Sequence, residues 1–394
     1  MNILKQKGST LVTGGNGYLG GLIIEALLRK TNRPLVVLAR KGNNLENILE
    51  PIRIERMSRG EVLTTQDIER VLVLNYDSIE SLGDVKESLI KNNVTEIIHS
   101  AGCVEYFNVE ALEKVNVEMT ERLLDLSNSI SLDRFIFIST AYSCGYINFQ
   151  SKETLHSRPN SDPTDYTRTK REAEWLVGNS GISNIIIRPS IVIGNSESGR
   201  YSGKRYGLYQ QWMGLERLLC DRYHEEYHLV APHQPVNFLH QDSFQNGFIG
   251  VYNNIEKSSV VHLTSNTNTA PTMRQLWELW LNQVARPKRV YYYPKLEDVP
   301  LTSIHSRQRA YLMFASVNLE IASHYWDFST DTLTKLRSNG MEFTDATLES
   351  VALCQKRFVN SSERIKKFIS SNNDKTKSSP EIVELSKAIH CQAV

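Results

Sequence analysis

The stretch that decides the fold of this chain is Leu11-Val12-Thr13-Gly14-Gly15-Asn16-Gly17-Tyr18-Leu19-Gly20. An apolar strand pattern runs into three glycines at every third position, and an apolar helix pattern over residues 22–28 follows them. Glycine lets the backbone turn tightly and approach a pyrophosphate, and the helix then presents unpaired N–H groups and its positive dipole end to that anion. Spaced glycines also mark ordinary turns, but strand, glycines and helix in this order predict a dinucleotide site.

The end of the second predicted strand indicates which dinucleotide binds. Residues 34–39 are apolar, Arg40 and Lys41 follow them, and no acid lies between Arg33 and Asn44. An Asp or Glu about 20 residues after the glycines binds a free ribose 2′-hydroxyl, whereas a guanidinium binds a 2′-phosphate through paired charge-assisted bonds. A solvated basic turn would look the same in sequence. We expect NADP(H) rather than NAD(H), bound by Arg40 and Lys41.

Length, charge and cysteine usage limit the class of protein. The 394 residues suffice for two domains or one enlarged α/β unit, and a formal net charge of +1 gives no reason to expect nucleic acid or an anionic membrane as partner. The first eight residues lack a secretory apolar core, and no apolar run is long enough to span a bilayer. Five scattered cysteines without CxxC spacing argue against a disulfide framework and a zinc site. We expect a cytoplasmic globular protein without a bound metal.

Apolar β-rich segments alternate with helical patterns through the first half of the chain. Short strands that are apolar throughout and are separated by helices are typical of a parallel sheet covered on both faces, which predicts a doubly wound, Rossmann-type α/β fold. After the first two, the expected strands lie at residues 71–74, 96–99, 134–138 and 184–187.

After Gly194 this regularity breaks, and we expect a second unit. Residues 195–234 are richer in Gly, Ser, Arg and Tyr, strand patterns return at 235–239 and 260–263, and a helical remainder follows. The expected parts are an NADP-binding Rossmann domain (1–194 with 235–264), a smaller, mostly helical substrate-binding domain (195–234 with 265–370), and a flexible linker and C-terminal tail (371–394). A short helix pattern around Ile382 lies in that tail.

Tyr166 and Lys170 stand four residues apart in a segment predicted to be helical, which places both on one helix face. A lysine charge held close would lower the pKa of the phenol, so that it can exchange a proton with a substrate oxygen at neutral pH. The spacing alone carries little weight in a chain with 17 tyrosines. Its context decides: Ser139-Thr140 puts hydroxyls at the end of a strand, where ligands bind in doubly wound folds, and Pro189, at the end of another strand, interrupts regular pairing.

Taken together, these motifs resemble the extended short-chain dehydrogenase/reductases over about residues 8–265. The spaced glycines, His99-Ser100-Ala101-Gly102, the Ser-Thr strand end, Tyr166 with Lys170, and Arg188-Pro189-Ser190 stand in the order and spacing of that family. Within it, the segments STAY (139–142), YTRTK (166–170) and RPSIVIGNSESG (188–199) look most like the thioester reductase and fatty acyl reductase branch. That branch includes the terminal reductases of carboxylic acid reductases and of nonribosomal peptide or polyketide assembly lines.

The resemblance implies a role for each matching residue. Thr140, with Ser139 as the alternative, would hydrogen-bond the substrate carbonyl, Tyr166 would donate the proton, and Lys170 would tune Tyr166 and hold the nicotinamide ribose. It implies cofactor contacts from the glycine-rich segment, the basic pair and later strand ends: Thr13, Gly14, Asn16, Gly17, Tyr18, Leu19, Gly20, Arg40, Lys41, Asp77, Ala101, Gly102, Tyr166, Lys170, Pro189 and Ile191. Asn75-Tyr76-Asp77 replaces the usual Gly-Asp, a departure at the adenine contact.

The activity implied by the resemblance is NADPH-dependent reduction of an acyl-thioester, bound to a carrier protein or coenzyme A, to an aldehyde, with onward reduction to the alcohol left open. The alternative is a reductase or dehydrogenase of a small ketone, aldehyde or alcohol in secondary metabolism. A non-catalytic NADP sensor is disfavoured because all three triad positions keep competent residues. The basic residues Arg200, Lys204 and Arg205 would either steer an anionic arm of the substrate or form a solvated flap.

Overall fold

Seven parallel strands form the centre of the larger part of the protein. The computed structural model describes residues 8–159, 161–203, 206–284, 286–373 and 378–384. The strands follow the order β10-β6-β5-β4-β1-β2-β3, and every neighbouring pair is parallel. Their bounds are β1 Ser9–Thr13, β2 Leu35–Arg40, β3 Val71–Tyr76, β4 Val94–His99, β5 Arg134–Ile138, β6 Asn184–Pro189 and β10 Ser259–Leu263. The predicted doubly wound α/β fold is confirmed.

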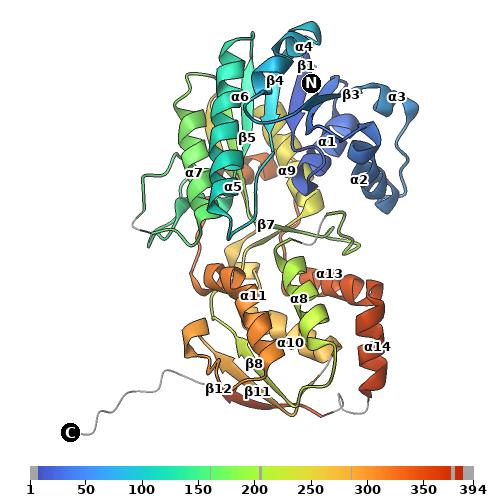
Figure 1. Cartoon of the computed structure of the whole chain (residues 1–394), viewed down its shortest axis with the longest axis vertical. Helices are drawn as coiled ribbons and strands as arrows, with labels where there is room; N and C mark the ends of the chain where they lie inside the picture. The colour runs from blue at the N-terminus through green and yellow to red at the C-terminus, as the bar shows by residue number, and fades with distance from the viewer. Residues whose placement is uncertain (1–7, 160, 204–205, 285, 374–377, 385–394) are drawn as a thin grey trace, which may run out of the picture.

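Helices cover both faces of this sheet (Figure 1). One face carries α1 Tyr18–Lys30, α2 Leu45–Ser58 and α9 Gln241–Asn254, with α12 Asp331–Ser338 packed against α9 and β10. The other face carries α4 Lys86–Lys91, α6 Met119–Asn128 and α7 Asp165–Gly178. The short helices α3 Thr65–Glu69 and α5 Val109–Leu112 lie at the periphery, and α5 continues through a π-helical turn, Glu113–Glu118, into α6.

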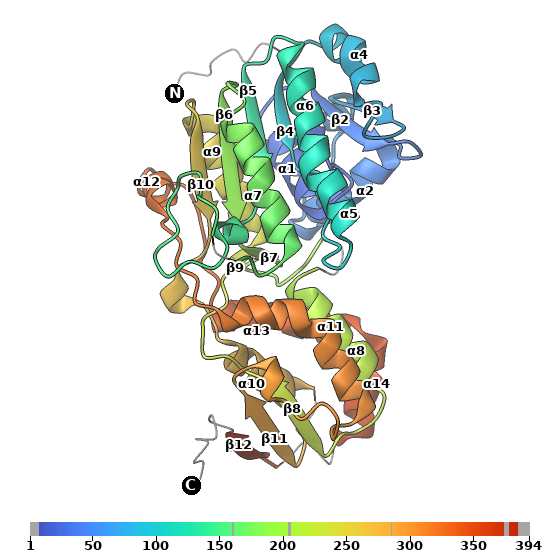
Figure 2. The ribbon, with the colours of Figure 1, turned by 60° about the vertical axis from the view of Figure 1, so that its left-hand side comes forward.

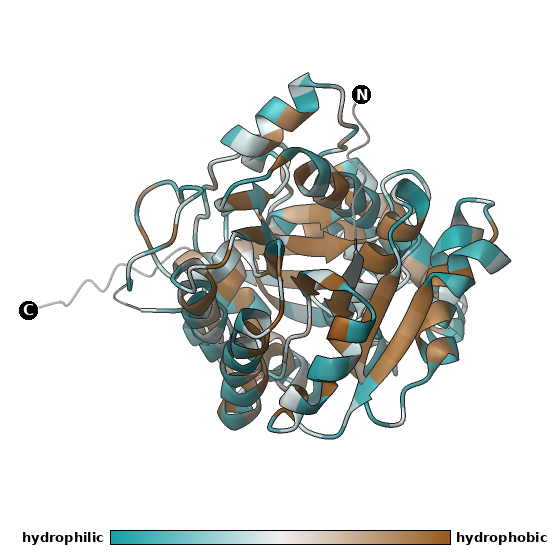
Figure 3. Cartoon of the chain, turned by 90° about the horizontal axis from the view of Figure 1, so that it is seen from above, coloured by the Kyte–Doolittle hydropathy of each residue, from teal (hydrophilic) through white to brown (hydrophobic). Residues whose placement is uncertain are grey.

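The strands supply two cores because neighbouring residues along a strand point to opposite faces. Val12 and Ile98 lie in the core beneath α1, α2 and α9, whereas Leu11 and Ile97 lie in the core beneath α6 and α7. Figure 3 shows the consequence from above: apolar strands lie in the middle, and the outer sides of the helices are hydrophilic. The apolar strand patterns of the sequence thus come from burial on both faces.

The second unit lies next to the first, on the side of β7 Ile191–Ile193 and β9 Phe238–His240 (Figures 1 and 2). It has its own aromatic core. Trp277, Trp280 and Tyr292 are buried in it. Its helices are α8 Leu208–Leu219, α10 Met273–Gln283, α11 Ser306–Ser323, α13 Leu348–Ser361 and α14 Glu363–Ser371. They pack with a three-stranded parallel sheet of order β12-β11-β8, formed by β8 Glu226–Val230, β11 Arg289–Tyr293 and β12 Glu381–Glu384.

The strand β12 corrects the helix pattern that the sequence indicated around Ile382. Ile382 pairs with Val290 of β11, and the ion pair between Glu381 and Arg289, at 2.9 Å, fastens the strand. The edge of β11 has backbone groups that need partners, and the β-branched side chains of Ile382 and Val383 suit an extended backbone. Residues 385–394, which complete the expected helix pattern, lie outside the described residues.

Two short parallel strands, β7 Ile191–Ile193 and β9 Phe238–His240, lie between the two units (Figure 2). Contacts from late in the chain also reach the larger unit: Trp326 and Phe328 pack on Tyr142, and Leu333 enters the core of α9. Among the helices of the described residues, none combines the length and the apolar character needed to cross a bilayer.

Candidate active site

The glycine-rich segment forms a tight turn between β1 and α1. Gly14 adopts a φ of +71°, and a Cβ there would lie 2.7 Å from the backbone of Ala101. A Cβ on Gly20 would lie 2.1 Å from the Gly14 carbonyl oxygen, which itself accepts a hydrogen bond of 2.8 Å from the Gly17 N–H. Gly14 and Gly20 are therefore required by close packing of the turn against α1 and against the end of β4.

The start of α1 fits the pyrophosphate of a dinucleotide. Gly17 is the N-cap residue, no side chain caps the helix, and its first turn has no acidic residue. The first N–H groups of a helix have no partner within the helix, so they and the helix dipole favour an anion at this end. Tyr18 and Leu19 line the cavity that opens at this point.

The predicted 2′-phosphate contacts lie at the neighbouring ends of β2 and β3. Arg40 ends β2 with an exposed side chain, and Lys41 forms an ion pair of 3.1 Å with Asp77, the residue after β3. The Asn16 amide contacts Asn43 at 3.2 Å, which links the glycine-rich turn to the turn after Arg40. Asp77 therefore holds Lys41, a partner that the resemblance did not imply.

Buried hydrogen bonds fix the end of β4 beside the glycine-rich turn. The Thr13 hydroxyl lies 2.8 Å from Nδ1 of His99 and accepts a bond of 3.1 Å from the Ala101 N–H. Thr120 lies 3.0 Å from the other ring nitrogen of His99. Burial, and then the Lys170 charge, lower the pKa of His99 to about 3, so this ring is neutral at physiological pH. His99 therefore links the end of β1 to α6 as a buried neutral ring.

Tyr166 and Lys170 lie on α7, as predicted, and both line the cavity. The Thr164 hydroxyl caps α7 by accepting from the Thr167 N–H at 3.1 Å, which places Tyr166 in the first turn. The Lys170 ammonium donates to the Ile138 carbonyl at 2.8 Å and lies 4.1 Å from the centre of the Phe137 ring. Burial lowers the pKa of Lys170 to about 7, with a smaller opposing effect from Glu174.

The electrostatics of Tyr166 differ from the sequence-based expectation. Burial raises the pKa of Tyr166 above its usual value, and Tyr106 and Cys103 push it further in the same direction. The Tyr106 ring meets the Tyr166 ring edge-on at 5.7 Å between centroids. Because Lys170 is itself buried and bound to a carbonyl, it does not offset this desolvation, and Tyr166 stays a protonated phenol at neutral pH.

Thr140 follows β5 and begins the short 3-10 turn Ala141–Cys144. Its hydroxyl oxygen accepts from the Tyr142 N–H at 3.4 Å, so its own O–H can still donate to a substrate oxygen. Ser139 also lines the cavity. Pro189 ends β6: it still lies in register with Leu263 of β10, whereas the register of β6 with β5 ends at Ile187 and β7 begins only at Ile191. A proline still accepts through its carbonyl and fits at a strand end.

One cavity brings together most of the predicted residues. Those that line it are Gly17, Tyr18, Leu19, Gly20, Gly102, Thr140, Tyr166, Lys170, Pro189 and Ile191. The other predicted residues lie outside this lining: Thr13 and Gly14 contact Ala101, Asn16 lies in the glycine-rich turn, and Arg40, Lys41 and Asp77 lie at the ends of β2 and β3. The predicted basic segment is described at Arg200 alone, since residues 204–205 lie outside the described residues.

Several lining or supporting residues had no signal in the sequence. Tyr106, Asn318 and Ile321 line the cavity from a loop and from α11. Asn116, fully buried in the π-helical turn, accepts from the Cys103 N–H at 2.8 Å and donates to the Thr169 hydroxyl at 3.1 Å, which ties the loop after β4 to α7. A π-turn is rare and is frequent at functional sites, but no short motif predicts it.

The comparison with protein families identifies this arrangement. The family described as Male sterility protein, an NAD-binding family, matches residues 12–242, more than half of the chain. The chain belongs to this family. The match includes the glycine-rich turn, Thr140, Tyr166, Lys170 and the strand end at Pro189.

Relatives and solved structures agree with this family. A putative fatty acyl-CoA reductase of Drosophila melanogaster, CG8306, is 26% identical over an alignment of 223 positions, with 47% of this chain and 43% of that protein covered. The chain therefore spans less than half the length of this curated relative. The terminal R domain of the myxalamid PKS-NRPS pathway has a TM-score of 0.68 at 18% identity, with 90% of each chain covered. The enzyme WbmH of Bordetella bronchiseptica, solved in complex with NAD+, has a TM-score of 0.58 at 11% identity, with 90% and 99% covered.

At these identities the solved structures show a shared fold. The family match supports a nicotinamide dinucleotide as the cofactor of this chain.

Proposed function

We propose that this family member is an NADPH-dependent reductase that converts an acyl-thioester, on coenzyme A or on a carrier protein, to an aldehyde. The observation that carries the proposal is the shared cavity: the glycine-rich start of α1, Thr140, Tyr166 and Lys170 line the same space. The similarity to a fatty acyl-CoA reductase and to a terminal R domain supports a thioester rather than a ketone. The remaining walls are largely apolar, with Val104, Ile191 and Ile321, which suits an acyl group.

The residues present fit the dinucleotide, which supplies a hydride to the acyl carbon when it is bound. Gly17 and the start of α1 would hold its pyrophosphate, Arg40 its 2′-phosphate, and Lys170 its ribose. The balanced reaction consumes one acyl-thioester, one NADPH and one proton, and it yields an aldehyde, a free thiol and NADP+. The choice of NADPH rests on Arg40, which stands where an acid would serve NADH.

Thr140 and Tyr166 would stabilise the oxygen of the substrate carbonyl as negative charge develops on it. Thr140 would donate a hydrogen bond to that oxygen, and Tyr166 would donate a second one and then its proton, which gives a hemithioacetal. The hemithioacetal then breaks its C–S bond, and its hydroxyl proton ends on the departing thiolate, so that the aldehyde and the free thiol are released. The raised pKa of Tyr166 keeps the phenol protonated before the reaction, which is the form a proton donor requires. Lys170, whose pKa of about 7 lies near neutrality, can exchange a proton with solvent or with a neighbouring hydroxyl at little cost.

The test is a panel of acyl-CoA, acyl-pantetheine, aldehyde and ketone substrates incubated with the purified protein and NADPH. We expect one free thiol per NADPH consumed when the aldehyde is the product, and one per two NADPH when reduction continues to the alcohol. Thiol release is measured with a chromogenic disulfide, and Tyr166→Phe is the matched control for background hydrolysis. Reduction of ketones or aldehydes without any thiol release from the thioesters would replace this proposal by the small-carbonyl reductase.

A further inference from the structure

A short segment of the second unit lies against the helix that begins the cofactor site. We call residues 201–203 the strap. The Tyr201 ring lies 4.6 Å from the Tyr18 ring and stacks on Tyr209 at 3.7 Å between centroids. A Cβ on Gly203 would lie 2.4 Å from the Tyr18 ring, so the strap backbone rests directly on that ring. Tyr201 also lines the cavity that contains the start of α1.

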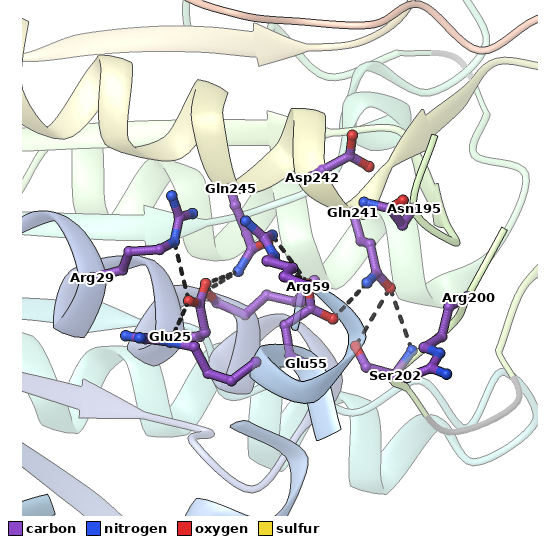
Figure 4. Close-up of polar contacts among 12 residues, drawn as sticks. Glu25, Arg29, Glu55, Arg59, Asn195, Arg200, Ser202, Gln241, Asp242 and Gln245 are labelled. Carbon is purple, nitrogen blue, oxygen red and sulfur yellow. Dashed lines mark hydrogen bonds and ion pairs between the residues drawn. The ribbon is translucent and has the colours of Figure 1, made fainter. Parts of the chain in front are cut away.

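One buried amide joins the strap to Tyr18. Gln241, the first residue of α9, has no solvent exposure. Its carbonyl oxygen accepts from the Tyr18 hydroxyl at 3.1 Å, from the Ser202 N–H at 3.3 Å and from the Ser202 hydroxyl at 3.4 Å. Figure 4 shows this amide between the strap and α2. Tyr18 and Ser202 therefore share one acceptor oxygen, although the Tyr18 hydroxyl also lies 3.4 Å from the Ile193 carbonyl and Ser202 also bonds Glu55.

A carboxylate decides which way this amide points. The Gln241 NH2 group donates to Glu55 of α2 at 2.6 Å. Glu55, 1% exposed, is held in turn by an ion pair of 3.1 Å with Arg59. An ionised carboxylate accepts hydrogen bonds and cannot donate them, so it selects the orientation in which the NH2 group faces Glu55 and the carbonyl faces the strap.

Two further residues of α9, Asp242 and Gln245, have other hydrogen-bond partners. Asp242 accepts from the Ser196 N–H at 2.9 Å and holds the turn before the strap. Gln245, one helical turn after Gln241, is also fully buried, but it donates to the Leu22 carbonyl at 3.1 Å and to Glu25 (Figure 4). Gln245 also accepts from Arg59, the ion-pair partner of Glu55, so it belongs to the same buried network and contacts both α1 and α2. Gln241 alone of the two contacts Tyr18 and the strap.

We propose that Gln241, oriented by Glu55, is a positioning residue for the nicotinamide dinucleotide, because it fixes Tyr18 and the strap together beside the pyrophosphate site. This inference rests on the dinucleotide site and needs neither a particular acyl substrate nor a choice between NADH and NADPH. Its consequence is kinetic: a fixed strap slows departure of the bound dinucleotide, and a loosened strap speeds it.

The test measures release of reduced dinucleotide by stopped-flow fluorescence after mixing with excess oxidised dinucleotide. Gln241→Met keeps the length and volume of the side chain and removes all its hydrogen bonds. We expect it to raise the dissociation rate about tenfold, as expected for lost hydrogen bonds between buried groups. Gln308→Met is the matched control: it removes a buried amide of α11 that donates to the Glu226 carbonyl at 2.6 Å and accepts from the His228 N–H at 3.0 Å, apart from the strap and from Glu55. It should lower the melting temperature similarly while the release rate stays within about twofold of wild type.

A reciprocal exchange tests the orientation argument. Glu55→Gln alone and Gln241→Glu alone each disturb the pairing, since one leaves two amides and the other two carboxylates in contact. The double variant restores one amide and one carboxylate with their places exchanged, and the new carboxylate can still accept from Tyr18 and Ser202. We expect its release rate to lie closer to wild type than that of either single variant. A double variant no better than both singles would overturn the proposal.

A further variant covers the case in which Gln241→Met does not fold. Gly203→Ala leaves the buried amide intact and pushes the strap away from the Tyr18 ring, so it should also speed release. Wild-type release rates in both Gln241→Met and Gly203→Ala, or equal acceleration in Gln308→Met, would refute a positioning role. A wild-type protein that binds neither NADH nor NADPH would instead refute the dinucleotide site and with it the proposed function.

Discussion

Replacing Glu174 by glutamine should destabilise the protein strongly, because Glu174 is half of a fully buried ion pair. Glu174 on α7 and Arg188 on β6 are both 0% exposed. The Arg188 guanidinium donates to both carboxylate oxygens, at 2.9 and 2.5 Å, and the Ser143 hydroxyl adds a bond of 2.8 Å. The pair thus connects the helix of Tyr166 and Lys170 with the strand of Pro189 and the turn after Thr140.

The magnitude follows from what the substitution leaves behind. Glu174→Gln preserves the volume of the side chain but leaves the Arg188 charge in the interior without a counter-charge. Such a change typically lowers the free energy of unfolding by about 3–5 kcal/mol. Arg188 also donates to the Lys152 carbonyl at 3.3 Å, a contact that survives, so we expect a value near the lower end, about 3 kcal/mol. Glu174 also raises the pKa of Lys170 from one helical turn away, so its loss should lower that pKa further.

The assay is urea unfolding followed by circular dichroism, with Glu278→Gln as the control. Glu278 pairs with Arg274 at 2.8 Å, four residues apart on α10, but it is 47% exposed, so this substitution should cost under about 1 kcal/mol. Glu174→Gln should also shift the part of the pH–rate profile that depends on Lys170 toward lower pH. Glu278→Gln should leave the profile unchanged. Equal free energies of unfolding for the two variants would refute the reasoning that burial makes the first pair strong.

Three further predictions concern catalysis, cofactor choice and pH. Tyr166→Phe should lower turnover by about 10²–10⁴ while cofactor affinity, measured by fluorescence titration, stays nearly unchanged; unaltered turnover would place the chemistry elsewhere. Arg40→Asp should weaken NADPH binding by about 2 kcal/mol in calorimetry and leave NADH binding much less affected, and equal affinity of the wild type for both would contradict the assignment. Burial lowers the pKa of both His99 and His262 to about 3, so the unfolded chain binds more protons below the ordinary histidine pKa. The free energy of unfolding should therefore reach its full value above about pH 6.5 and be about 2 kcal/mol lower per histidine at pH 5. The decrease should be smaller in His99→Asn.

The sheet could be predicted from sequence because its strands are buried on both faces. β5, with Phe135, Ile136 and Phe137 each 0% exposed, reads as a continuous apolar run, and such runs between helices have few other interpretations. The small sheet of the second unit could not be predicted in the same way. Its strand β12 is short, carries Glu381 and Glu384 with exposed side chains, and depends on β11 for its pairing. Its own residues therefore contain little of the information that makes it a strand.

The candidate site divides along similar lines. The glycine-rich turn and the Tyr166–Lys170 pair are local motifs, because the residues that form each pattern lie within a few positions of one another in the sequence. The contacts of Gln241 with Glu55 and Tyr18 join residues 186 and 223 positions apart, and Asn318 and Ile321 reach the cavity from α11. Such contacts depend on how the second unit packs against the sheet, which no spacing along the chain expresses.

The protonation of Tyr166 and Lys170 shows why a motif alone can mislead about mechanism. The spacing of Tyr166 and Lys170 predicted a phenol acidified by a nearby charge, yet desolvation raises the pKa of Tyr166 and lowers that of Lys170. Burial disfavours the charged form of both groups, so the pair favours a neutral phenol beside an amine that titrates near neutrality. A neutral phenol is the form needed to protonate an oxygen that has just gained negative charge. A phenolate would be the form needed to remove a proton from an alcohol. The environment of the pair therefore keeps Tyr166 in the form that a proton donor requires, which the two residues alone do not determine.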